Sequence, residues 1–207
     1  MEPRWLLWSR ELQAIAQTGL AFCQDEFDVE RYRAIRRLAS EIMADHSGSE
    51  SFRIENLFAE QTGYATPKVD VRAAAFQGER VLMVRERLDN GLWTLPGGWA
   101  DVNQSPSECV IKEVREESGF EVVVRKLAAV FDRAKHPHKP PFPFHIYKMF
   151  FLCEIVGGAA STSIETSEVG FFSETELPEL STGRVLASQI QRMFDHWRDT
   201  ALPTDFD

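Results

Sequence analysis

The sequence predicts an α/β protein in which a small helical region precedes a region of strands and helices. Three observations support this prediction: apolar residues at helical spacing up to about residue 60, then β-branched and apolar segments, and a helical stripe near the end. A chain of 207 residues with 43% hydrophobic content can bury a real core, as one domain or as one domain with an appendage. We expect the boundary near residue 64, which gives domains 1–64 and 65–207.

Two apolar stripes and a shorter segment predict the N-terminal helices. The helical region is expected to close over a substrate or to form a dimer contact through Trp5 and Trp8, with internal packing as the alternative. A third helix is expected over 52–58, before a linker at 63–67. The two stripes are Trp5, Trp8, Leu12, Ile15 and Ala16, and then Tyr32, Ile35, Ala39 and Ile42.

Four later segments are rich in β-branched and apolar residues, and turn residues separate them, as in a sheet. These segments are 69–76, 81–87, 122–131 and 144–155, with turns at 77–78 and 90–91. The last helix is expected to start near Ser181, and its apolar stripe indicates core packing.

The most informative segment places three carboxylates on one helix face behind a Gly-Gly turn. Glu113, Glu116 and Glu117 stand at positions i, i+3 and i+4, so they share one side of a helix. Like charges this close repel unless a cation lies among them, and hard oxygen ligands select Mg²⁺ or Mn²⁺. The pattern therefore predicts a divalent-metal site. The alternative is a solvated acidic face in which Lys112 and Glu116 form an ordinary ion pair.

The ends of this helix are also encoded locally. Ser105 can cap its start, Pro106 suits the first turn, and Glu108 completes a capping box. Gly119 supplies the stop.

The stretch from Gly98 to Phe120 resembles the signature of the Nudix hydrolases, Gly-x5-Glu-x7-Arg-Glu-U-x-Glu-Glu-x-Gly-U, where U is a bulky apolar residue. Only Gln104 and Lys112 depart from it, where the family has Glu and Arg. The resemblance implies an α/β/α sandwich around a mixed sheet. It also implies Mg²⁺, with Mn²⁺ possible, held by the three glutamates together with Gly98. The family's arginine has a planar guanidinium that orients neighbouring carboxylates, whereas Lys112 has a single ammonium group on a flexible side chain. The orientation of these carboxylates should therefore differ.

Further segments are similar to a Nudix subgroup that includes CDP-choline pyrophosphatase and has an N-terminal helical extension. In that subgroup, Lys112 and a non-acidic residue at position 104 are ordinary. This resemblance implies cleavage of CDP-choline to CMP and phosphocholine, with ADP-ribose or a nucleotide sugar as the nearest alternative. The segments are 5–20, 64–70, 95–102, 135–136 and 163–166.

A metal site of this kind suits substitution at phosphorus in a diphosphate, because cations bridge phosphate oxygens and lower the pKa of a bound water. We expect the general base to be a helix glutamate or a carboxylate of the loop 163–168, with Glu165 favoured over Glu168. For either loop residue the alternative is a solvated acid.

Substrate contacts are assigned to three residues, each with an alternative. Arg72 could grip a phosphate or form a structural ion pair. Trp99 could stack on a base, meet a choline cation or serve packing. His136, and less so His138, could cover the nucleotide or be a bystander.

Charge and cysteine content limit the remaining function classes. A formal net charge of -9 argues against extended nucleic-acid binding, although trimming of a short RNA 3′ end stays open as an alternative. A catalytically silent module that senses a nucleotide is a further alternative. The three cysteines indicate neither a disulfide framework nor a zinc site, and the first residues match neither a signal peptide nor a membrane span. We expect a cytoplasmic homodimer without membrane contact.

Overall fold

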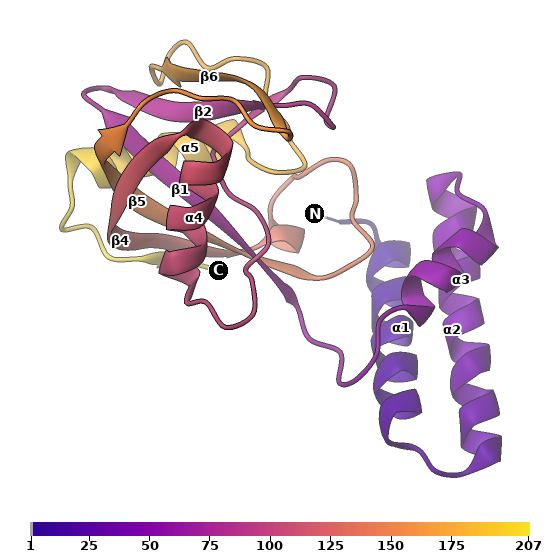
Figure 1. Ribbon diagram of the computed structural model, residues 1–207. Helices are drawn as coiled ribbons and strands as arrows, with labels where there is room; N and C mark the ends of the chain where they lie inside the picture. The colour runs from indigo at the N-terminus through magenta and orange to yellow at the C-terminus, as the bar shows by residue number, and fades with distance from the viewer. Residues whose placement is uncertain (1) are drawn as a thin grey trace. The chain divides into compact units, whose positions relative to one another are not determined.

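The computed structural model describes residues 2–207, which divide into two compact units (Figure 1). The helical unit contains residues 2–67 and the short segment 141–145. The mixed unit contains residues 68–140 and 146–207. Within the described residues, no helix is both long and apolar enough to cross a membrane.

The helical unit consists of α1 (Arg4–Phe22), α2 (Glu26–Ser47) and α3 (Ser51–Ala59). Asp25 caps α2, since its carboxylate accepts hydrogen bonds from the backbone N–H groups of Phe27 and Asp28. Two polar side chains also join the helices: the Ser9 hydroxyl donates to the Ala39 carbonyl, and the Gln13 amide donates to the Phe58 carbonyl. The buried apolar side chains between the helices are Leu6, Ala39, Met43, Ile54 and Phe58.

The two N-terminal tryptophans have different surroundings. Trp5 stacks on His46 with ring centroids 4.8 Å apart and packs against the core of the helical unit. Its environment is therefore the internal packing that was the alternative to a dimer contact. Trp8 is 50% exposed, and the Arg4 guanidinium lies 5.1 Å from its ring centroid.

The mixed unit is built on one sheet whose strand order is β3-β2-β1-β5-β4-β7, with β6 paired to β2. The central β1 and β5 are parallel, while β1–β2, β2–β6 and β4–β5 are antiparallel. The strands are β1 (Lys68–Gln77), β2 (Arg80–Glu86), β3 (Trp93–Thr94), β4 (Phe120–Asp132), β5 (Ile146–Gly158), β6 (Thr166–Phe172) and β7 (Asp205–Phe206).

Helices cover both faces of this sheet, because both faces carry apolar side chains. On one face, α4 (Pro106–Ser118) buries Cys109, Val110 and Val114 against the sheet. On the other, α5 (Ala187–Arg198) buries Ile190, Met193 and Phe194 (Figure 1). The expected α/β/α arrangement around a mixed sheet is confirmed.

Helix α4 has the predicted ends. The Ser105 hydroxyl accepts from the Glu108 N–H, the Glu108 carboxylate accepts from the Ser105 N–H at 2.7 Å, and Pro106 opens the helix. Gly119 closes it in the left-handed region at φ 76°. These local signals fix where the acidic face begins and ends.

The last helix starts later than expected, at Ala187 rather than near Ser181. Residues 181–185 form a turn instead, in which the backbone N–H groups of Arg184 and Val185 both donate to the Ser181 carbonyl. The Arg184 guanidinium is drawn to Asp89 at 2.9 Å, and this ion pair ties the turn to the loop after β2.

Candidate active site

The three glutamates of α4 differ in burial. Glu117 is 4% exposed, and its Oε2 accepts a 2.9 Å hydrogen bond from the backbone N–H of Gly97. The Glu113 carboxylate lies against Gly98, where an added Cβ would be 3.3 Å from its oxygens. Glu116 is exposed and lies two residues before the end of the helix. The acidic face therefore runs from the protein interior to solvent across the Gly-Gly turn.

The Gly-Gly turn approaches strand β1 so closely that a side chain at Gly97 has no room. Its φ is +141°, and a Cβ there would lie 2.0 Å from the Val71 carbonyl oxygen. Val71 donates its N–H to the Gly98 carbonyl at 2.8 Å. The Gly98 carbonyl, predicted as a metal ligand, thus already accepts one backbone hydrogen bond, and a carbonyl has a second lone pair.

Burial disfavours the charged forms of the two inner carboxylates. It raises the pKa of Glu117 to about 8, although Arg72 and the Gly97 N–H act in the opposite direction. Burial also raises the pKa of Glu113, and Glu116 and Glu165 add to the rise. A divalent cation would favour the ionised forms of both groups.

The donor set suits Mg²⁺ or Mn²⁺, because carboxylate and carbonyl oxygens are the ligands these ions prefer. Among residues 2–207, however, no three His, Cys, Asp or Glu side chains are already gathered as they would be around a metal ion. The Glu117 carboxylate is hydrogen-bonded to the turn and the Glu113 carboxylate lies against it, while exposed Glu116 lies 3.7 Å from Lys112. For all three glutamates to bind one ion, their carboxylates would have to come closer together.

Lys112 also contacts the loop after the turn. Its Nζ donates to Asp101 at 2.7 Å, in addition to its longer contact with Glu116. The ion pair that was the alternative to metal binding is therefore present. Cys109 holds the same loop, since its sulfur accepts from the Asp101 N–H at 3.3 Å.

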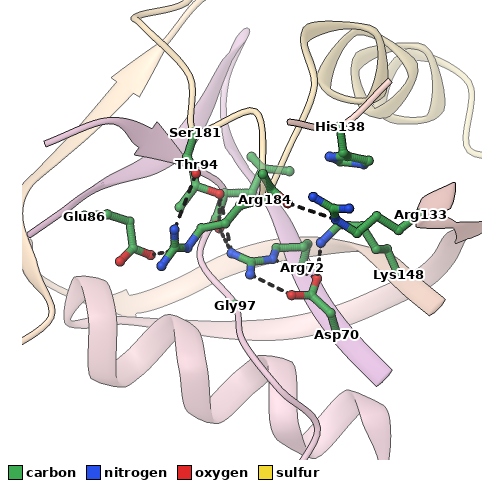
Figure 2. Close-up of polar contacts among 12 residues, drawn as sticks. Asp70, Arg72, Glu86, Thr94, Gly97, Arg133, His138, Lys148, Ser181 and Arg184 are labelled. Atoms are coloured by element: carbon green, nitrogen blue, oxygen red, sulfur yellow. Dashed lines mark hydrogen bonds and ion pairs between the residues drawn. The ribbon is translucent and has the colours of Figure 1, made fainter. Parts of the chain in front are cut away.

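Arg72 lies on β1 in a buried ion cluster rather than at the surface (Figure 2). Its Nε and Nη2 donate to the two oxygens of Asp70 at 3.0 and 2.7 Å, and its Nη1 donates to the Leu95 carbonyl at 3.2 Å. Lys148 on β5 donates to Asp70 Oδ1 at 2.6 Å. The paired donors expected to grip a phosphate are thus held by Asp70, which is the structural ion pair considered as the alternative.

The ionisation of this cluster follows from its burial and its charges. Burial alone would raise the pKa of Asp70, but Arg72 and Lys148 bring it down to about 2. Burial lowers the pKa of Lys148 to about 8 despite its contact with Asp70. We conclude that Asp70 is ionised at neutral pH and holds both cations.

Two residues near the acidic face were not identified from the sequence. Glu86, at the end of β2, is 5% exposed, and burial raises its pKa. Arg184 faces it, with Nε 3.3 Å from the Glu86 carboxylate (Figure 2). An acidic residue that ends a strand with the apolar run 81–84 is the signal that could have revealed Glu86.

The two loop carboxylates have different neighbours. Glu168 lies on β6 and pairs with Arg85 at 2.5 Å. Glu165 precedes β6, and its charge contributes to the raised pKa values of Glu113 and Glu86. Of the two, Glu165 is the one that interacts electrostatically with the acidic face.

The aromatic candidates are placed as follows. Trp99 is 47% exposed and follows the Gly-Gly turn directly. His136 lies 3.0 Å from Asp207, and its ring contacts Phe131. His138 is buried between the Thr182 carbonyl and the side chain of Gln189. The substrate roles of Trp99 and His136 stay predictions.

Comparison with known proteins identifies both units. A family model of the NUDIX domain matches residues 66–193, and a model described as a UDP-X-like, N-terminal oligomerisation domain matches residues 3–58. A relative from Bacillus subtilis (strain 168), which carries the provisional name ADP-ribose pyrophosphatase YjhB, is 44% identical over 207 residues, covering 100% of this chain and 99% of its own.

Two solved structures are also similar. An ADP-ribose pyrophosphatase from Streptococcus suis 89-1591 is 40% identical with a TM-score of 0.63, covering 69% of this chain and 100% of its own. A UDP-X diphosphatase is 32% identical with a TM-score of 0.63, covering 99% of this chain and 98% of its own.

Proposed function

The chain belongs to the Nudix family of hydrolases, and from this premise we propose that it is a metal-dependent pyrophosphohydrolase. Its substrate is a nucleoside diphosphate joined to a second moiety. The observation that carries the proposal is the placement of Glu113 and Glu117 against Gly98 and Gly97, which brings a half-buried and a buried carboxylate to one turn. Two carboxylates placed in this way are costly to ionise unless a cation is bound, so their placement suits a metal site better than a solvated acidic surface.

Glu113, Glu116 and Glu117 would hold Mg²⁺, with the Gly98 carbonyl as a further oxygen ligand. When bound, the cation supplies charge neutralisation at the diphosphate and a lowered pKa of bound water. Gly97 fixes the Glu117 carboxylate through its N–H, so one ligand is oriented in advance. Glu165 is the proposed general base.

CDP-choline is the proposed substrate on the strength of the sequence resemblance around residues 64–70 and 95–102. ADP-ribose is the second candidate, because the Bacillus and Streptococcus relatives carry that substrate in their names. Trp99 bears on this choice, since its half-exposed ring directly follows the Gly-Gly turn and suits a base or a choline cation.

The experiment that tests the substrate is chromatographic product analysis with Mg²⁺, on a panel of CDP-choline, ADP-ribose, a UDP-sugar and a short RNA. Fastest formation of CMP and phosphocholine supports the first proposal, whereas preferential cleavage of ADP-ribose supports the second. Preferential RNA trimming would overturn both. No hydrolysis of any member would indicate a silent nucleotide-binding module.

Glu116→Gln tests the metal ligands. We expect turnover to fall by orders of magnitude, because a cation ligand is lost. The fold should stay intact, because Glu116 is exposed and the substitution removes only its charge. Glu79→Gln, an exposed carboxylate in the β1–β2 turn, is the matched control and should leave turnover unchanged. Near-normal activity of Glu116→Gln would defeat the site assignment.

Trp99→Ala tests the substrate contact. It should impair CDP-choline use more than ADP-ribose use, and Trp99→Phe should restore much of the difference because it keeps an aromatic face. Equal losses on the two substrates would indicate a packing role.

A further inference from the structure

A buried threonine joins the loop that carries Glu165 to the end of helix α4. Thr166 has no exposed surface, and its hydroxyl donates a 2.7 Å hydrogen bond to the backbone carbonyl of Glu117. The last four carbonyls of a helix have no partner within the helix, so a side chain from another segment can satisfy one of them. Since Thr166 follows Glu165 directly, this bond ties the backbone of the proposed general base to the backbone of a proposed metal ligand.

Two other residues hold the backbone around Glu165. The N–H groups of Glu165 and Thr166 both donate to the Ser163 hydroxyl at 3.1 Å. Arg87 donates from its backbone N–H to the Glu165 carbonyl at 2.8 Å and from its Nε to the Thr166 carbonyl at 3.1 Å. The peptide unit between Glu165 and Thr166 is therefore fixed within its own loop, to the residue that follows β2 and to the end of α4.

The Glu165 side chain, in contrast to its backbone, is exposed to solvent. A general base needs this combination, because it must reach a water molecule and yet stay close to its working position. A solvated acid without a function does not need its backbone held at these points.

We propose that Thr166 is a positioning residue that sets the place of Glu165 relative to the glutamates of α4. This inference rests on the proposed function, because it takes Glu165 as the general base. Thr166 acts on the loop rather than on Glu117, because the helix fixes the Glu117 backbone and the Gly97 N–H holds its carboxylate. Loss of the hydroxyl should therefore let the loop shift while the metal ligands stay in place. A displacement of about 1 Å at an active site can cost roughly 100-fold in rate.

Thr166→Val tests the inference, because valine keeps the branched shape and removes only the hydroxyl. The assay uses CDP-choline or ADP-ribose, whichever the wild type cleaves faster. We expect kcat to fall by about 10- to 100-fold with KM unchanged, and Thr166→Ser to restore most of the loss. Binding of Mn²⁺ alone, measured by electron paramagnetic resonance, should be unchanged. Thr204→Val is the matched control and should leave kcat unchanged, since the Thr204 hydroxyl donates to the Leu127 carbonyl at the same 2.7 Å, next to β7.

A double variant shows whether Thr166 acts through Glu165. Glu165→Gln alone should lower kcat by about 100-fold or more, the usual contribution of a general base. In that background Thr166→Val should cause no further loss, because no base is left to misplace. A further loss of similar size, or weaker Mn²⁺ binding by Thr166→Val, would show that Thr166 supports the metal site instead and would overturn the inference.

Ser163→Ala tests the same loop without touching α4, and so applies even if Thr166→Val does not fold. It frees the N–H groups of Glu165 and Thr166, so kcat should again fall while Mn²⁺ binding is kept. Normal kcat in both loop variants of an active enzyme would overturn the inference alone. A wild type that cleaves no diphosphate would overturn the proposed function and the inference together.

Discussion

Asp70→Asn removes the only carboxylate in the buried cluster with Arg72 and Lys148. The side chains of these three residues are 7%, 4% and 2% exposed, so solvent cannot replace the lost charge. Breaking a buried ion pair by removing one partner costs about 3–5 kcal/mol. We expect the free energy of unfolding to fall by roughly that amount at pH 7, measured by urea denaturation followed by near-UV circular dichroism.

A matched variant separates lost charge from lost packing. Lys148→Met keeps a side chain of similar length and leaves Asp70 with both hydrogen bonds to Arg72. It should therefore lower the free energy of unfolding less than Asp70→Asn does. In the double variant the losses should not add, because one of the two stranded cations is gone. Additive losses would argue against a coupled cluster.

The pH dependence of the Asp70→Asn effect follows from the lowered pKa of Asp70. A carboxylate whose pKa falls from 3.8 to about 2 on folding stabilises the folded state above pH 4, and this stabilisation is lost as the pH falls to 2. The shift corresponds to roughly 2 kcal/mol at 1.36 kcal/mol per pKa unit. The difference between wild type and variant should therefore shrink by about that much between pH 5 and pH 2. A loss below about 1 kcal/mol at pH 7, or a difference that stays constant with pH, would refute the reasoning.

Three further outcomes are expected. Gly97→Ala should prevent stable folding or lower the melting temperature severely, because its Cβ would overlap a strand carbonyl; a normal melting curve would contradict this. Burial lowers the pKa of His138 to about 3, so its contribution to stability is complete above about pH 6.5 and is lost as the pH falls towards 3. His138→Gln should flatten that part of the stability profile in acid titration, and an unchanged slope would argue against it. Only Cys23 should react quickly with a thiol reagent in the native protein, since Cys109 and Cys153 are buried; fast labelling of all three thiols would show otherwise.

Local signals in the sequence were sufficient for helix α4. Ser105, Glu108 and Gly119 act within one helical turn of the positions they cap, so the bounds of α4 follow from nearest neighbours alone. The same holds for the shared face of the glutamates, because helix geometry fixes it. Their unequal burial could not be predicted, since it depends on how the Gly-Gly turn meets β1.

Features that depend on distant segments were missed. The strands β3 and β7 have two residues each, too few to show alternation, and they exist only through pairing with β2 and β4. Arg72 and Lys148 are far apart in the sequence and meet only because β1 and β5 are neighbours. Two polar residues on an apolar strand signal a buried partner, but not which residue it is.

The parallel pairing of β1 and β5 has a consequence for how the chain folds during synthesis. Asp70 and Lys148 are separated by 78 residues, and helix α4 lies between them in the sequence. At about 5–20 residues per second, a ribosome needs roughly 4 to 16 s to add that length. Throughout this interval the apolar β1 has no β5 partner, so the emerging chain exposes a strand edge on which chaperones or other nascent chains could act.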